Sequence, residues 1–145
     1  MRILLPGNLM KHLFITLIFL TMLPACKQPD TIPESRYSYL VKHSWDYTSM
    51  SVNGSPQTLS PCLVDDIWTF GSTGSMLLNF GDLRCSFSQP QNVSGSFSLS
   101  PDQNTLYMTH SGSTFTYLVN NVDEYTLDIS EAVGWDTTRY FLNAR

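Results

Sequence analysis

The residues of this sequence that could carry out acid–base chemistry are few. Asp65 and Asp66 form an acidic pair directly before the apolar run 67–70. If that run is a strand, successive side chains point to opposite faces, so the two carboxyls cannot work as one acid–base couple. We expect an aspartate at this loop-to-strand junction to accept backbone N–H hydrogen bonds. A calcium or substrate site is the alternative.

Histidines and serines add no catalytic arrangement that the sequence alone can identify. His43 and His110 lie far apart in the chain, and neither has the paired spacing of a metal site. The many serines lack the Gly-x-Ser-x-Gly pattern of a nucleophile elbow. We therefore predict no catalytic residues, no metal site and no cofactor, and we expect that the protein is not an enzyme.

The N-terminal residues have the pattern of an export signal. Arg2 and Lys11 supply positive charge, and an apolar run follows at residues 12–22. This run is shorter than the roughly 20 residues that cross a bilayer as a helix. It ends in Leu23-Pro24-Ala25-Cys26, which resembles the lipobox of bacterial lipoproteins.

The lipobox resemblance implies how the N-terminus is processed. It implies that residues 1–25 form a lipoprotein signal peptide and that Cys26 is lipidated and becomes the mature N-terminus. Several acyl chains on Cys26 would then hold the protein on a membrane. Residues 26–36 contain two prolines and are expected to form a tether. Lys27 is not an acidic retention signal, so we expect an outer-membrane lipoprotein of the cell envelope.

The three cysteines of the sequence then each have a use. Lipidation of Cys26 leaves Cys62 and Cys85 as an even pair in an oxidising compartment, where a disulfide persists. This disulfide would close a loop of about 23 residues and contribute about 3 kcal/mol on the chain-entropy estimate. It encloses a predicted hairpin, with strands at 67–70 and 75–80 around the turn 71–74.

The charge of the chain excludes some partners. The formal net charge is −4, and without Arg2 and Lys11 it becomes −6, with six basic residues against twelve acidic ones. A surface this acidic argues against binding to nucleic acid and against electrostatic attachment to anionic lipid. The expected link to the membrane is therefore the acyl group on Cys26.

The sequence after the tether predicts an all-β domain over residues 37–145. Short segments with period-two alternation are separated by turn residues, and one helical turn is expected at 37–41. The predicted strands are 44–52, 67–70, 75–80, 95–100, 105–110, 114–119, 125–129 and 138–142, with a polar loop at 55–60. Eight sequential strands favour a small up-and-down antiparallel β-barrel, and a sandwich is the alternative.

The order of several short motifs carries a family resemblance. Ser44-Trp45 opens a strand that ends at Val52-Asn53-Gly54, and Cys62 precedes Asp65-Asp66-Ile67-Trp68-Thr69-Phe70. Gly74, Cys85 and the segment 95–99 follow. This order resembles the lipocalin-like domain lipoproteins common in Bacteroidota. The resemblance implies a lipocalin-like (calycin) barrel, preceded by a signal peptide, whose ligand is uncertain.

The inward-facing side chains predicted by alternation are aromatic and apolar. The candidate ligand-lining residues are Trp45, Tyr47, Trp68, Phe70, Phe80, Phe97, Leu99, Phe115 and Tyr117, and the same interior is expected to hold Met76, Leu78, Met108, Leu127 and Ile129. Two interpretations stay open. The side chains either fill the barrel to ordinary packing density or line a pocket that opens at one end.

We therefore expect a non-enzymatic, lipid-anchored envelope protein that binds a small hydrophobic ligand. The alternative is a module that binds an envelope protein or a glycan through its loops, with a filled barrel and no ligand cavity. In that case Trp135, within the segment 131–136, is a candidate anchor for the partner.

Overall fold

The computed structural model describes residues 35–145. The predicted signal peptide and Cys26, with most of the tether, lie outside these residues and stay predictions. The elements are helix α2 (Arg36–Lys42), a short 3-10 helix η1 (Pro61–Leu63), and nine strands: β1 (Ser44–Val52), β2 (Ser55–Gln57), β3 (Ile67–Phe70), β4 (Ser75–Asn79), β5 (Asn92–Leu99), β6 (Thr105–His110), β7 (Ser113–Val122), β8 (Thr126–Val133) and β9 (Asp136–Ala144). No helix in this part of the chain is long and apolar enough to cross a bilayer.

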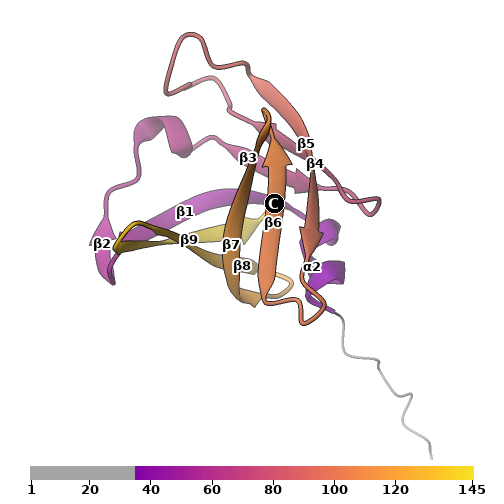
Figure 1. Cartoon of the computed structure of the whole chain (residues 1–145). Coiled ribbons are helices and arrows are strands. Elements are labelled where there is room, and N and C mark those ends of the chain that lie inside the picture. The colour runs from indigo at the N-terminus through magenta and orange to yellow at the C-terminus, as the bar shows by residue number, and fades with distance from the viewer. Residues whose placement is uncertain (1–34) are drawn as a thin grey trace, which may run out of the picture. The chain divides into compact units, whose positions relative to one another are not determined.

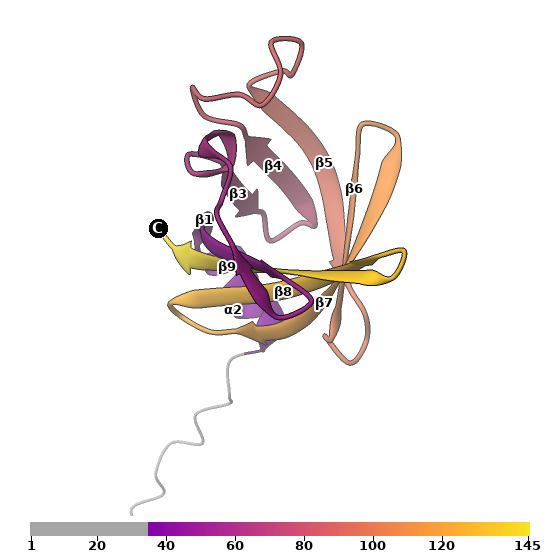
Figure 2. The same cartoon turned by 90° about the vertical axis from the view of Figure 1, so that its left-hand side faces the viewer.

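The strands form one antiparallel sheet that closes into a barrel (Figures 1 and 2). Neighbours follow the chain order from β3 to β9, and β1 pairs with β3 on one side and with β9 on the other. The closing register runs from the pair Trp45↔Ala144 to the pair Val52↔Thr138. The predicted eight-stranded up-and-down barrel is therefore confirmed, with β2 as an additional strand, and the sandwich alternative is excluded. All strands belong to one compact unit, Glu34–Arg145.

Strand β2 corrects the predicted polar loop at 55–60. Asn53 and Gly54 have φ values of 51° and 79°, which suit a tight hairpin turn between strands. The hairpin pairs Val52 with Ser55 and Met50 with Gln57. The sequence Ser-Pro-Gln hid this strand because it has no apolar alternation, and proline in a sheet is confined to edges.

Helix α2 closes one end of the barrel. Ser35 caps its N-terminus, since the Ser35 Oγ accepts a hydrogen bond from the Ser38 N–H at 3.1 Å. Leu40 on this helix is buried at 1% exposure. The Arg36 guanidinium donates to the Val119 carbonyl at 2.8 Å, which ties the helix to β7. Figures 1 and 2 show α2 at the opposite end of the barrel from the loop between β4 and β5.

The barrel interior contains most of the side chains that alternation predicted. Its buried core consists of Leu40, Trp45, Trp68, Phe70, Met76, Leu78, Phe97, Leu106, Met108, Tyr117, Val119, Val122, Leu127, Ile129 and Leu142. Tyr47, Phe80 and Leu99 are half-buried against this core. Phe115 differs from the rest, because it is 36% exposed. It lies near the start of β7, before Leu118, where the pairing with β8 begins.

Candidate functional site

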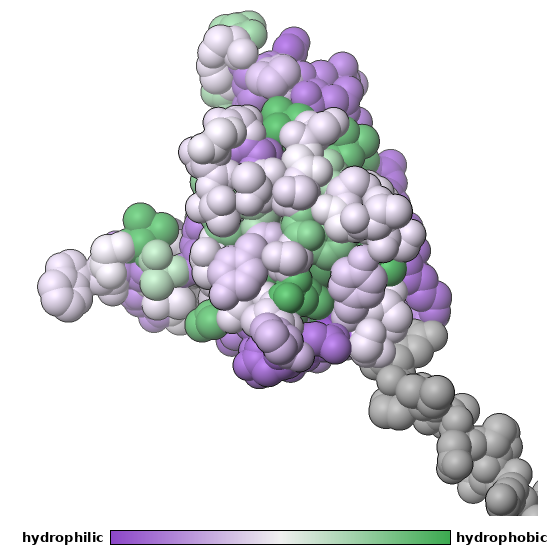
Figure 3. Space-filling model, turned by 45° about the vertical axis from the view of Figure 1, so that its right-hand side comes forward, coloured by the Kyte–Doolittle hydropathy of each residue, from purple (hydrophilic) through white to green (hydrophobic). Residues whose placement is uncertain are grey.

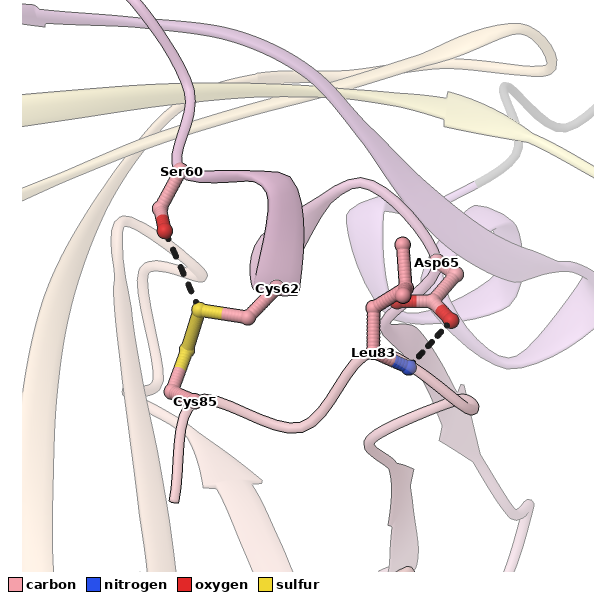
Figure 4. The surroundings of a disulfide bond; sticks show 5 residues. All are labelled: Ser60, Cys62, Asp65, Leu83 and Cys85. Atoms are coloured by element: carbon pink, nitrogen blue, oxygen red, sulfur yellow. Dashed lines mark hydrogen bonds between the residues drawn. A yellow bond between two sulfur atoms is a disulfide. The ribbon is translucent and has the colours of Figure 1, made fainter.

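Two cross-links hold the segment that enters β3 (Figure 4). The predicted disulfide between Cys62 and Cys85 is present, with the two Cα atoms 5.0 Å apart. The Asp65 carboxylate accepts hydrogen bonds from the backbone N–H groups of Asp82 at 2.7 Å and Leu83 at 3.0 Å. The hydrogen bond from Leu83 is the main reason that the pKa of Asp65 is lowered. Segment 62–65 is thereby fixed to the loop after β4.

Asp65 lies in a turn and Asp66 directly precedes β3, and the two carboxyls have different surroundings. Asp66 is buried at 3% exposure, and its Oδ1 has no hydrogen-bond partner. Burial, together with the nearby Asp65 carboxylate, raises the pKa of Asp66 to about 6. The predicted hydrogen bonding to backbone N–H groups therefore describes Asp65 and not Asp66.

Asp66 belongs to a group of polar side chains inside the barrel, which we call the tyrosine–carboxyl cluster: Tyr47, Asp66, Tyr117, Glu131 and Tyr140. The Tyr140 hydroxyl donates a hydrogen bond to Glu131 Oε1 at 2.7 Å. Burial raises the pKa of Tyr47 well above its usual value. The phenols of Tyr117 and Tyr140, and then both carboxyls, raise this pKa further because they lie close to Tyr47. The cluster thus draws on strands β1, β7, β8 and β9 and on the entry to β3.

Aromatic rings form the wall beside this cluster. Tyr47 packs edge to face against Trp68, with ring centroids 5.4 Å apart, and against Tyr140 at 5.6 Å. Trp68 also contacts the rings of Tyr117 at 5.8 Å and Phe70 at 6.3 Å. Rings at these separations touch each other, so side chains fill the middle of the barrel.

The predicted lining residues divide between the two ends. Phe97 stacks on Tyr37 of α2 at 5.8 Å and contacts Phe70 at 4.9 Å, so both lie toward the helix-covered end. Trp45 lies under α2, and Leu99 lines an outer hollow beside Tyr37. The remaining lining residues, Tyr47, Trp68, Phe80, Phe115 and Tyr117, lie in the middle of the barrel or toward the other end.

His43 and His110 also lie at different ends of the barrel. His43 follows α2 and packs edge to face against Trp45, with its buried Nε2 unpaired. His110 ends β6 and stacks on Phe115, with ring centroids 4.6 Å apart, and burial lowers the pKa of His110. Within residues 35–145, no three His, Cys, Asp or Glu side chains are grouped closely enough to hold a metal ion.

A second site lies on the outer face of the barrel and was not predicted. A hollow of about 600 Å³ crosses β1, β2, β7, β8 and β9. On its floor, the guanidinium of Arg139 forms a two-pronged pair with the buried Asp128 carboxylate. The Asn120 amide also donates to Asp128 at 3.0 Å, and Arg139 lies over the Phe141 ring at 4.9 Å. A bulge between Val119 and Asn121 interrupts the β7–β8 register beside Asn120, and no sequence signal marks this bulge.

The outer surface offers no large apolar platform on the side shown in Figure 3, where hydrophobic residues form small separate patches. Trp135 is 103% exposed at the tip of the β8–β9 hairpin. It therefore does not cap the barrel end.

Comparisons with known proteins inform the fold only. No family model and no curated protein matches the chain. An uncharacterized protein from Bacteroides eggerthii superposes with a TM-score of 0.51 at 12% identity, covering 71% of this chain and 98% of that one. A lipocalin-like protein from Bacteroides uniformis gives a TM-score of 0.54 at 12% identity, covering 74% of this chain and 99% of the other. Together with the closed barrel, this similarity shows that the chain has a lipocalin-like fold.

Proposed function

We propose that this protein is a non-enzymatic lipoprotein of the cell envelope that binds a small, compact and mainly apolar ligand. The acyl chains on Cys26 anchor it to the outer membrane, and the barrel receives the ligand. The observation that carries the proposal is the buried Asp66 oxygen, which has no protein partner at the end of the barrel that α2 leaves uncovered. Buried polar atoms are almost always hydrogen-bonded in native proteins, so an unpaired one indicates a missing partner.

The surroundings of Asp66 fit a ligand with one polar end. The rings of Tyr47, Trp68 and Tyr117 provide apolar faces, and the tyrosine hydroxyls provide polar groups beside them. Such a combination of aromatic wall and few polar groups is typical of small-molecule sites. Because contacting rings fill the middle of the barrel, we expect a compact ligand and not a long acyl chain.

The test uses residues 27–145, which contain the whole compact unit, and the neutral apolar fluorophore N-phenyl-1-naphthylamine. Val93 of β5 packs against the core, while the next residue, Ser94, is exposed on the outer face. Val93→Trp should weaken binding of the fluorophore about tenfold or more by placing a bulky ring at this end, and Ser94→Trp should leave it unchanged. Equal binding by both variants, with both shown to be folded by circular dichroism, would contradict the proposal.

A second candidate function is recognition of an envelope glycan or protein on the outer face. The hollow of about 600 Å³ there favours it, because Arg139, Asn120 and the Phe141 ring combine charged, amide and aromatic contacts. Arg139→Lys keeps the charge but loses the two-pronged pair with Asp128, so it should abolish capture of a glycan or an envelope extract. Unchanged capture by Arg139→Lys would exclude this hollow as the binding surface.

A further inference from the structure

The tyrosine–carboxyl cluster contains two carboxyls and no basic side chain. The five lysines and arginines of residues 35–145 have partners elsewhere: Arg36 with Asn104, Lys42 with Glu124, Arg84 with Gln89, Arg139 with Asp128 and Arg145 with Asp46. In this part of the chain, neither Asp66 nor Glu131 is hydrogen-bonded or ion-paired to a basic group. The negative charge at this end of the barrel is therefore not balanced by the described residues.

The two carboxyls differ in their hydrogen bonding. Glu131 already accepts the hydrogen bond from the Tyr140 hydroxyl. Asp66 is almost fully buried, and its Oδ1 accepts none. An unpaired carboxylate is one of the most unfavourable groups to bury, unless a cation or a hydrogen-bond donor reaches it. The site at Asp66 is thus complementary to a donor with positive charge.

We infer that the ligand carries a protonated amine on a compact apolar body, and that the amine binds the Asp66 carboxylate inside the barrel. This inference rests on the proposed function and specifies its ligand class. An ammonium group is a compact charge with three N–H donors, which fits one free carboxylate oxygen. The rings of Tyr47 and Trp68 stabilise a cation placed beside them. Glu131 adds a second negative charge nearby.

Other ligand classes fit this end of the barrel less well. A fatty acid or another carboxylate would place a third negative charge beside Asp66 and Glu131, which like-charge repulsion disfavours. A metal ion needs several ligands grouped around it, and residues 35–145 offer no such group. A neutral alcohol could donate to Asp66 but would leave its charge unbalanced.

The experiment compares three probes of the same shape by isothermal titration with residues 27–145: 2-phenylethylamine, 2-phenylethanol and phenylacetate. We expect the amine to bind roughly tenfold or more tightly than the alcohol, and phenylacetate to bind most weakly. The isosteric variant Asp66→Asn should reduce the preference for the amine over the alcohol about tenfold. The control variant Asp82→Asn removes an exposed carboxylate at the same end of the barrel and should keep the preference.

The outcomes separate this inference from the proposed function. Equal binding of amine and alcohol, or an unchanged preference in Asp66→Asn, overturns the amine assignment while the barrel remains a binding site. If none of the three probes and no neutral fluorophore binds, the proposed function fails and the inference fails with it.

Discussion

The indole Nε1 of Trp45 donates a hydrogen bond of 3.0 Å to the carbonyl oxygen of Leu40. Both side chains are buried, Trp45 at 0% and Leu40 at 1% exposure. This bond fastens the last turn of α2 to the first strand and satisfies a carbonyl that the helix end leaves free. The helix therefore closes this end of the barrel, which leaves the opposite end for the proposed ligand.

We expect Trp45→Phe to destabilise the protein by about 2–3 kcal/mol, because the variant loses the hydrogen bond and leaves a cavity. Urea unfolding measures the change in the free energy of unfolding. Trp135→Phe is the matched control: its exposed ring should change stability by less than about 0.5 kcal/mol. Similar losses in both variants would show that α2 is not held by Trp45.

Removing the disulfide should lower stability without removing the fold. Replacing Cys62 and Cys85 together by serine frees a loop with a sequence separation of 23 residues, and we expect a loss of about 3 kcal/mol. Unfolding experiments with and without reductant measure this loss. Reductant should destabilise the native protein to the level of the double variant and leave the variant unchanged. An equally stable double variant would contradict this prediction.

Much of this fold could be predicted because its signals are local. Strands β1, β3 and β6 were predicted with the bounds that they have in the structure, since Ser44, Ile67 and Thr105 each begin a period-two alternation that ends at turn residues. Other elements depend on partners that are distant in sequence. Strand β2 exists because it pairs with β1, and β9 extends to Ala144 because β1 pairs with it.

Asp66 should make the native state more stable as the pH falls from about 7 to about 4. Its pKa is about 6 in the folded protein against a usual 3.8, so the folded state takes up this proton before the unfolded state does. The gain should be about 2 kcal/mol after allowance for solvent screening. It is present in full below the unfolded pKa and is lost as the pH rises through the folded pKa.

The variant Asp66→Asn isolates this contribution. Asp65 and Asp123 have lowered carboxyl pKa values, so the stability that they contribute falls as the pH falls, and it does so in the native protein and in the variant alike. Urea midpoints at pH 7.5 and pH 5 should show the native protein gaining relative to the variant at the lower pH. Parallel pH profiles would mean that Asp66 titrates normally.

Gly81 should be sensitive to substitution because the loop passes close to Asp65. A Cβ at Gly81 would lie 2.2 Å from the Asp65 carboxyl carbon and 2.8 Å from the Asp65 carbonyl oxygen, on a backbone with a φ of +53°. We expect Gly81→Ala to cost about 2–3 kcal/mol in thermal or urea unfolding. Gly54→Ala also has a positive φ but meets nothing within 4 Å, so it should cost only about 1 kcal/mol. Equal losses of stability in the two variants would show that the close approach of Gly81 to Asp65 does not affect stability.

The candidate site was harder to predict than the barrel. Alternation placed Tyr47 and Tyr117 inside correctly. The expectation that an aspartate at this junction accepts backbone N–H hydrogen bonds missed the burial of Asp66, because burial depends on contacts between segments that are distant in the sequence. The sequence predicted no role for Glu131 and Tyr140, since their hydrogen bond joins two neighbouring strands and depends on the β8–β9 register. The outer pair of Asp128 and Arg139 was missed for the same reason.

The most direct test of the central claim is native mass spectrometry of residues 27–145 after export into an oxidising compartment. The claim predicts a mass above that of the disulfide-bonded chain. Organic solvent should remove the excess, which should be a compact amphipathic molecule. If no such molecule is carried along, added 2-phenylethylamine should form a one-to-one complex. The bare mass of the disulfide-bonded chain, unchanged by the amine and by neutral apolar probes, would contradict ligand binding by the barrel and direct attention to the hollow around Arg139.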